Sequence, residues 1–282
     1  TGVVRRFIPH RHQAGRVMTG ATNITSHVIS DTFEKTQMGT QQESFEHRFK
    51  TVLTHLSQAM SEMRKDTFLE YKKRLNMSHS MSGDFDYTFT DELTTRARYW
   101  TNPDGSKGGI VSVNALIEPS AVIEKNAVVF PDVIIEEDAV IGGKTQIQKD
   151  AFIGPNTRIG NNARVGEGAL IFENVRITEA VSIGTLVSIH HNVRIGHHAE
   201  IGMKVRICHS SIIGESVCIS KEAHIGRRVT IGEASIISNG AFIGDHVSIG
   251  NAVNIGQHAR INEGVCIDDG MTIKDEIARQ AT

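Results

Sequence analysis

The chain has 282 residues, of which 39% are hydrophobic and 22% charged, and 30 basic against 32 acidic side chains give a formal net charge of −2. These values are ordinary for a soluble globular protein and leave no overall field that would draw the chain to nucleic acid or to a membrane surface. No apolar stretch approaches the roughly 18–20 residues of a membrane span, and the N-terminus lacks the apolar core of a signal peptide. Three cysteines do not make a disulfide framework. We therefore expect a cytoplasmic protein without a membrane span.

The composition changes near residue 110. The stretch before it holds 11 of the 15 aromatic side chains, including the only Trp, whereas 18 of the 26 glycines follow it. Such a change marks a boundary between two unlike kinds of structure. We expect an N-terminal extension at 1–109, a second domain at 110–276 and a short tail at 277–282.

The N-terminal extension contains three segments with different patterns. Residues 1–20 carry four arginines and no acid, which suits either a basic arm for an acidic partner protein or a mobile tail. Residues 85–89 alternate as a strand does and can pair with residues 96–100, which gives a small β unit at about 85–100. Residues 41–75 are predicted to be helical, because apolar side chains recur there with spacings of 4 and 3. This seam suits a helix packed on the end of the second domain or a trimeric coiled coil; its members are Phe45, Phe49, Val52, Leu56, Ala59 and Met63.

The second domain is an internal repeat of six residues. From Ala115 to Ile273 the chain divides into sixes without one insertion, and the third residue of each six is Ile or Val at all 27 positions. Two residues earlier stands Ala, Val, Ser or Thr, with Met271 as the exception, and Gly follows the Ile or Val at 13 positions. This regularity identifies a solenoid rather than a globular core.

The period itself predicts the architecture. A short strand points its first and third residues inward and its second outward, and the next three residues, rich in Gly, Asn and Asp, suit a turn that needs positive φ. Strands that alternate with turns, without any hairpin signal, form a parallel solenoid. If three sixes close one coil, 27 sixes give nine coils that stack about 4.8 Å apart around a core of Ile.

This register resembles the hexapeptide-repeat family, whose fold is the left-handed parallel β-helix. The resemblance covers Ala115 to Ile273, some 56% of the chain. It implies a mainly β protein of about nine left-handed coils with an N-terminal helical or mixed extension. Most members are acyl- and acetyltransferases that work as trimers, which implies a homotrimer. The family also includes zinc carbonic anhydrases of the γ class and proteins with no known chemistry, so the fold alone does not decide the function.

Histidines are concentrated in one part of the repeat, where five of the 14 lie between residues 190 and 209. His191 and His209 are 18 residues apart, so we expect them at the same corner of successive coils, about 5 Å apart. The segment His191-Asn192-Val-Arg-Ile195-Gly196 is similar to the catalytic segment of the sugar and lipid A N-acyltransferases of the family. The resemblance implies that His191 is the general base and that His209 orients it or contacts the acyl donor. The alternative is that these are solvated surface histidines.

Other features oppose an enzyme or a metal site. The family's enzymes commonly carry a loop that closes over substrate, and no loop is inserted in the 27 sixes. The γ-class anhydrases place one His two coils from a pair that is five residues apart, whereas no two histidines here are 36 or five residues apart. His191 and His209 alone do not supply the three or four ligands of a zinc site. We expect no metal.

Outward positions of the strands give two further signals. Arg158, Arg176 and Arg194 stack in successive coils and need counter-anions. They suit a groove for the phosphates of coenzyme A, a common donor in the family; the alternative is pairing with turn acids of a neighbouring chain, such as Glu167, Glu173 or Glu179. An apolar stripe on another face predicts an interface with the N-terminal helix or with another subunit; it consists of Leu116, Ile134, Phe152 and Leu170.

Two hypotheses follow from these observations. In the first, the protein transfers an acyl or acetyl group from acyl-CoA or acyl-carrier protein to a hydroxyl or amine of a small molecule, with His191 as base at a subunit interface. In the second, it is a non-catalytic trimeric rod whose N-terminal region binds a partner. The unbroken repeat favours the rod, whereas the His-Asn motif and the local density of histidines favour the enzyme, which we take as the working hypothesis. We expect structural roles for Cys208, Cys218 and Cys266, because they show no nucleophile constellation.

Overall fold

The computed structural model of the chain describes residues 83–274. The chain divides into two units, Thr1–Ser80 and Met81–Thr282, and the described residues belong to the second. The basic arm at 1–20, the helix at 41–75 and the tail at 277–282 therefore lie outside the described residues. Between residues 83 and 274, no helix has the length and apolar character needed to cross a membrane.

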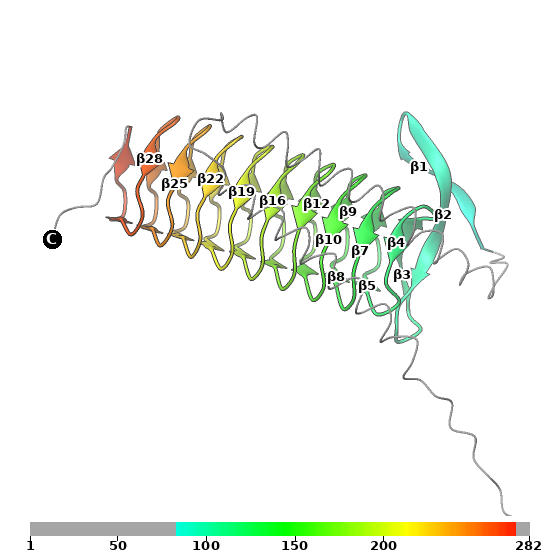
Figure 1. The fold of residues 1–282 in the computed structure, drawn as a ribbon. Helices are drawn as coiled ribbons and strands as arrows, with labels where there is room; N and C mark the ends of the chain where they lie inside the picture. The colour runs from blue at the N-terminus through cyan, green and yellow to red at the C-terminus, as the bar shows by residue number, and fades with distance from the viewer. Residues whose placement is uncertain (1–82, 275–282) are drawn as a thin grey trace, which may run out of the picture. The chain divides into compact units, whose positions relative to one another are not determined.

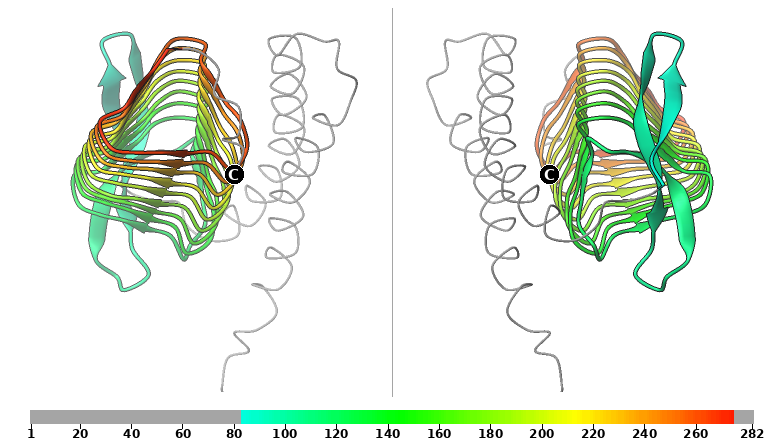
Figure 2. Two further views of the ribbon diagram at one scale, coloured as in Figure 1. Left: turned by 90° about the vertical axis from the view of Figure 1, so that its left-hand side faces the viewer. Right: turned by 90° about the vertical axis from the view of Figure 1, so that its right-hand side faces the viewer.

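The second unit is a left-handed parallel β-helix of about nine three-sided coils (Figures 1 and 2). This confirms the parallel solenoid that the six-residue repeat predicted and the left hand that the family resemblance implied. Each side of a coil is a two-residue strand, and strands on the same side stack into one of three sheets, so neighbours in a sheet are three strands apart in sequence.

The three sheets contain the following strands. The first sheet has 12 strands and begins with β1 (Phe85–Thr90), β2 (Leu93–Thr101) and β3 (Lys107–Ser112). It continues with β6 (Val128–Val129), β9 (Gln146–Ile147), β12 (Arg164–Val165), β15 (Ser182–Ile183), β18 (Glu200–Ile201), β21 (Cys218–Ile219), β24 (Ile236–Ile237), β27 (Asn254–Ile255) and β30 (Thr272–Ile273). The second sheet contains β4 (Leu116–Ile117), β7 (Ile134–Ile135), β10 (Phe152–Ile153), β13 (Leu170–Ile171), β16 (Ser188–Ile189), β19 (Arg206–Ile207), β22 (His224–Ile225), β25 (Phe242–Ile243) and β28 (Arg260–Ile261). The third sheet contains β5 (Val122–Ile123), β8 (Val140–Ile141), β11 (Arg158–Ile159), β14 (Arg176–Ile177), β17 (Arg194–Ile195), β20 (Ile212–Ile213), β23 (Thr230–Ile231), β26 (Ser248–Ile249) and β29 (Cys266–Ile267).

The core is the stack of Ile and Val side chains that the repeat predicted. All 27 third positions of the sixes are buried, and none is more than 8% exposed. Each coil also covers the backbone of its neighbour, because strand amides and carbonyls bond from coil to coil; for example, His190 N donates to Ile207 O over 2.9 Å. Stability therefore comes from contacts between neighbouring coils, as in other repeat proteins.

The turns between strands explain the polar half of the repeat. The sixth residue has positive φ in almost every coil, and Asn174 and Asn192 are examples at 58° and 60°. Asn and Asp tolerate this region better than other residues with a side chain. Gly196 is required for a different reason, since a Cβ added there would lie 2.7 Å from the carbonyl carbon of Gly214 in the next coil.

An antiparallel hairpin extends the first sheet beyond the first coil. Strand β1 pairs with residues 93–97 of β2, with Asp86 opposite Arg96, so the expected partner segment 96–100 meets β1 only at Arg96 and Ala97. Strand β2 pairs with β3, which in turn runs parallel to β6. Trp100 links the hairpin to the β-helix, because its Nε1 donates a hydrogen bond to Ala121 O over 3.0 Å and only 8% of the residue is exposed.

Candidate active site

The candidate site lies at the edge where the chain leaves the second sheet and turns toward the third. Every strand of the second sheet ends at an inward Ile or Val, so the next two residues of successive coils stack along this edge. Three neighbouring coils place aromatic, acidic and imidazole side chains here. We call this set the histidine corner; it comprises Phe172, Glu173, His190, His191, Cys208 and His209.

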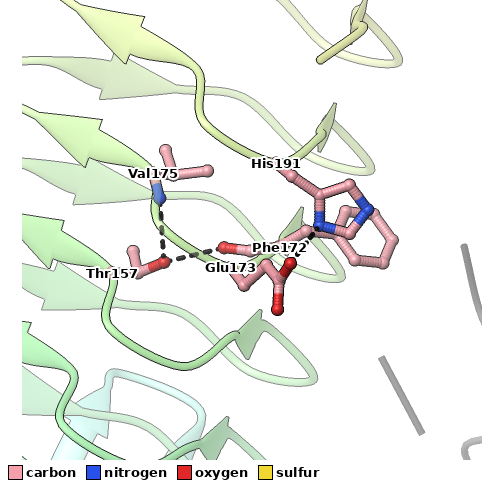
Figure 3. Close-up of polar contacts among 5 residues, drawn as sticks. All are labelled: Thr157, Phe172, Glu173, Val175 and His191. Atoms are coloured by element: carbon pink, nitrogen blue, oxygen red, sulfur yellow. Dashed lines mark hydrogen bonds and ion pairs between the residues drawn. The ribbon is translucent and has the colours of Figure 1, made fainter. Parts of the chain in front are cut away.

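A contact between His191 and Glu173 links two coils of the histidine corner (Figure 3). The Nδ1 atom of His191 lies 3.5 Å from Oε1 of Glu173, one coil away. The side chain of His191 is 17% exposed and that of Glu173 is 36% exposed, so the pair is partly screened from water. A carboxylate in this place orients the imidazole more firmly than it would at an open surface. Sequence reasoning named Glu173 only as a partner for arginine, although its 18-residue spacing from His191 was the signal that predicts this contact.

The two histidines expected at one corner are brought together. The ring centroids of His191 and His209 are 6.4 Å apart, with an angle of 37° between their planes. The ring of Phe172 packs against His191 with 5.5 Å between centroids, and it forms an apolar wall beside the imidazole. The proximity is thus as predicted, while the roles of base and helper stay predictions.

His190 is adjacent in sequence but differs in environment. It is 2% exposed and packs on Phe172 with 5.1 Å between ring centroids. Burial, followed by the charge of Arg206, holds the pKa of His190 well below 6.5. Arg206 is itself 6% exposed, and burial lowers its pKa to about 10, so it stays cationic at neutral pH. We therefore treat His190 as a neutral packing residue.

Much of the motif around His191 is determined by the coil geometry. Asn192 occupies a turn position with φ of 60°, and Gly196 lies where the next coil leaves no room for a side chain. Both residue types recur at equivalent positions throughout the repeat. Only His191 itself therefore carries information about chemistry.

A groove runs along the third sheet beside the histidine corner. It has a volume of about 800 Å³ and is lined by Ser120, Val122, Asp138, Val140, Asn156, Arg158, Asn174, Arg176, Asn192 and Arg194. Asn192 directly follows His191 and joins the groove to the corner. In the sheet, Arg176 lies between Arg158 and Arg194, and all three side chains are exposed. None of the three arginines makes an ion pair within residues 83–274, so the groove presents three uncompensated positive charges there.

The apolar stripe expected on another face belongs to the second sheet. Phe152 and Leu170 point away from the core and yet are only 1% and 5% exposed, whereas Leu116 and Ile134 are half-buried. Burial of outward side chains is typical of a covered face. Whether another segment or another subunit provides the cover stays a prediction.

One buried carboxyl lies on the same edge as the histidine corner, two coils before Phe172. Glu136 is 3% exposed, and its Oε2 atom makes no hydrogen bond to any described residue. Burial, followed by the charges of Glu118 and Glu137, raises the pKa of Glu136 to about 8. This group is therefore mostly protonated at neutral pH, and sequence reasoning did not identify it.

The remaining candidates do not form a second site. Cys208 is buried, Cys218 is half-buried and Cys266 is exposed; burial, followed by the charge of Glu200, raises the pKa of the Cys218 thiol. A raised pKa disfavours the thiolate that a nucleophile needs. In the part of the chain that the structure describes, no three His, Cys, Asp or Glu side chains are grouped so that they could hold a metal ion.

Comparisons with known proteins match the repeat. The model of the family described as the GMPPB C-terminal domain matches residues 139–229, and a search of curated proteins found no match. Among solved structures, the chain is similar to UDP-N-acetylglucosamine O-acyltransferase from Moraxella catarrhalis, with 24% identity and a TM-score of 0.37 over 54% of this chain and 70% of that one. It is similar to UDP-N-acetylglucosamine acyltransferase from Francisella novicida, with 19% identity and a TM-score of 0.38 over 58% and 62%. It is also similar to the acetyltransferase domain of PglB from Neisseria gonorrhoeae, with 17% identity and a TM-score of 0.34 over 49% and 55%.

The last two of these matches span less than two thirds of the solved chains. The repeat and the three-sheet solenoid are properties of this chain itself, with 27 sixes in register and every inward Ile or Val buried. On these grounds the chain is a parallel β-helix built from a six-residue repeat.

Proposed function

We propose that the protein is an acyltransferase that moves an acyl or acetyl group from a thioester donor, acyl-CoA or acyl-carrier protein, to a hydroxyl or amine of a small molecule. One observation carries the proposal. Glu173 and His191, which contact each other, are directly followed in sequence by Asn174 and Asn192, and these two line a groove together with Arg158, Arg176 and Arg194. A base therefore stands beside a surface suited to a donor that carries phosphate groups.

In this proposal His191 acts as general base. Nδ1 faces the Glu173 carboxylate over 3.5 Å, so we assign Nε2 as the atom that takes the proton from the acceptor. The acceptor oxygen or nitrogen then attacks the thioester carbonyl, the carbon–sulfur bond breaks, and the protonated imidazole returns the proton to the departing thiolate. Glu173 stabilises the imidazolium between these two steps.

The arginine groove provides the donor site of the proposal. Arg158, Arg176 and Arg194 follow one another at the coil spacing, and each can form a charge-assisted hydrogen bond with a phosphate oxygen. The donor phosphates would supply the counter-anions that the described residues do not provide.

We propose that the acceptor reaches His191 from the side of a second subunit, in a homotrimer. Light scattering tests this assembly, for which we expect a mass near three times 30.9 kDa.

The proposal is tested by replacing His191 and a matched control. We expect His191→Ala to reduce the rate of acyl transfer by about 10²–10⁴-fold with little change in donor affinity. His197→Ala is the control, because His197 is also a turn histidine but is exposed at another edge. His209→Ala should reduce the rate less than His191→Ala. Arg176→Ala should weaken donor binding in calorimetry with a panel of acyl-CoAs and with acyl-carrier protein. If the wild type binds neither class of donor at millimolar concentration, the proposal is wrong.

One observation favours a second function, that of a non-catalytic rod. Coils from Leu116 to Ile273 follow without an inserted loop, so the described residues include no segment that closes over a substrate. In that function the β-helix is a spacer and the N-terminal region binds a partner protein. The same calorimetry decides between the two, because a rod gives no heat with any donor.

A further inference from the structure

We infer that Thr157 is a positioning residue for the histidine corner, because its buried hydroxyl shapes the turn that presents Glu173 to His191. The effect of Thr157 on catalysis rests on the proposed function. The contacts of Thr157 do not depend on that function, so the test includes a measurement that requires no enzymatic turnover.

Thr157 bridges both ends of the turn that carries Glu173. The residue is fully buried, and its Oγ1 donates a hydrogen bond to Phe172 O over 2.7 Å (Figure 3). The same Oγ1 accepts a hydrogen bond from Val175 N over 3.3 Å. Phe172 O and Val175 N flank Glu173 on the two sides of the turn, so one hydroxyl satisfies both groups.

Two earlier turns at the same edge are closed by a direct backbone bond. Ala121 N donates to Glu118 O over 3.0 Å, and Ala139 N donates to Glu136 O over 3.4 Å. The Phe172–Val175 turn has no such direct bond, and the hydroxyl of Thr157 holds the N–H and the carbonyl instead. If the hydroxyl is lost, Phe172 O and Val175 N lose this buried partner, and the turn that carries Glu173 is no longer fixed.

Movement of this turn would alter two sides of the His191 ring. Glu173 contacts Nδ1 of His191, and the ring of Phe172 packs against the imidazole. The turn is also tied to the next coil, because Asn192 N donates to Glu173 O over 3.2 Å. A shift of the turn is therefore transmitted to the base through its carboxylate, its apolar wall and the adjacent backbone.

The same bridge occurs elsewhere in the β-helix, which supplies natural controls. Thr145 bridges Gly160 O and Ala163 N, and its contacts measure 2.7 and 3.1 Å. Ser211 and Ser235 make equivalent bridges in later coils. The bridge as such is thus a feature of the fold. Among the four bridging hydroxyls of the described residues, only Thr157 acts on the turn that holds the carboxylate of His191.

The experiment compares Thr157→Val with Thr145→Val, which removes the same hydroxyl from a turn at another edge. We expect Thr157→Val to reduce kcat by about 10–100-fold with the donor KM nearly unchanged, because small misplacements of reacting groups are costly. Thr157→Ser should restore the rate, and Thr145→Val should match the wild type. In a Glu173→Gln background, Thr157→Val should cause a smaller loss than in the wild type, since the Glu173 carboxylate is one of the routes by which the turn acts on His191.

A spectroscopic readout separates positioning from the proposed function. The ring ¹⁵N signals of His191 report its protonation and hydrogen bonding, to which Glu173, His190 and His209 contribute. We expect Glu173→Gln and Thr157→Val to move these signals in the same direction, and Thr145→Val to leave them in place. Thr157→Ala serves as a second variant if Thr157→Val melts early, because Ala occupies the same repeat position at 121 and 139.

Each contrary outcome has a distinct meaning. A wild type without turnover overturns the proposed function and leaves the ¹⁵N signals to decide the inference. Unchanged His191 signals in Thr157→Val and Thr157→Ala, beside a clear change in Glu173→Gln, overturn the positioning role. An equal loss of kcat in Thr145→Val, or an undiminished loss in the Glu173→Gln background, also overturns it and makes Thr157 a purely structural residue.

Discussion

The second and third sheets use the same repeat position in opposite ways. On the third sheet the outward residues Arg158, Arg176 and Arg194 are exposed and line a groove. On the second sheet the outward residues of four successive coils are buried, with exposed fractions between 1% and 6%; they are Phe152, Leu170, Ser188 and Arg206. The backbone is the same in both sheets. A residue's place in the six thus determines whether it points in or out, but not whether an outward side chain meets water.

This comparison locates the chemistry between the two faces. The histidine corner lies on the edge that separates them, so His191 has the open arginine groove on one side and the covered sheet on the other. An edge of this kind offers a charged group both a screened environment and an approach for ligand. The predictions below test the interior that both faces share, and then each face in turn.

The largest effect is expected from a charge in the shared interior. Ile195 is 1% exposed, and Ile195→Asp would bury a carboxylate without a partner, which costs several kcal/mol unless the group is neutralised. Because each coil is stabilised by its neighbours, both faces should be lost together. The control is Ile212→Asp, since Ile212 is an outward residue of the third sheet and is 44% exposed. Thermal melting should show a large decrease for the first variant and a small one for the second; equal melting midpoints would contradict the inward register.

The second prediction concerns Glu136 on the shared edge. Its pKa is raised to about 8 from 4.5, chiefly by burial, so the folded state prefers the protonated carboxyl. The free energy of unfolding should therefore fall as pH rises from about 4.5 to 8, with a slope of up to roughly 1.4 kcal/mol per pH unit. Glu136→Gln should remove this loss, so the free energy of unfolding of the variant should rise relative to that of the wild type between pH 4.5 and 8. Urea unfolding at a series of pH values measures this difference, and Glu215→Gln, at an exposed position, is the control.

The third prediction concerns acid stability of the covered second sheet. His224 stacks on Phe242 with 4.9 Å between ring centroids, and burial followed by the charge of Arg206 lowers the pKa of His224 to about 3 from 6.5. The folded state binds this proton less readily than the unfolded state, so stability is present above pH 6.5 and is lost as pH falls toward 3. We expect His224→Phe to be less sensitive to acid than the wild type between these values. The control is His246→Phe, and parallel acid curves for wild type and His224→Phe would contradict the assignment.

The smallest effect on stability is expected on the open third sheet. Arg176 is exposed and makes no ion pair within the described residues, so Arg176→Ala should change the free energy of unfolding by no more than about 0.5 kcal/mol. It should nevertheless weaken donor binding if the groove holds phosphates. Thr230→Ala, at the same position of a later coil, is the control for both measurements. A large loss of stability in Arg176→Ala would mean that the arginines pair with acids of a neighbouring subunit.

Prediction from sequence succeeded where the repeat is strict. The buried third positions, the pairing of strands 18 residues apart and the meeting of His191 with His209 all follow from the period of six and from three sixes per coil. The strand at 85–89 was visible from the alternation of Phe85, Tyr87 and Phe89, but its partner is residues 93–97 rather than the expected 96–100. The bridge made by Thr157 was not predicted, because Thr, Ala and Val are all acceptable at that inward position, and only the contacts of the hydroxyl distinguish them.

The sequence by itself determined which residues of the repeat point inward, because an Ile or Val that recurs every six residues must be buried along the whole repeat; the left hand was implied only by the family resemblance. The sequence also determined which residues share an edge, since that follows from counting 18 along the chain. Only the tertiary structure decided which of these neighbours contact each other, which of them are buried and how their pKa values change. It paired Glu173 with His191, buried His190 while leaving the groove arginines exposed, and raised the pKa of Glu136. These outcomes depend on distances of a few ångströms and on the burial of particular side chains, and neither is encoded in the period of the repeat.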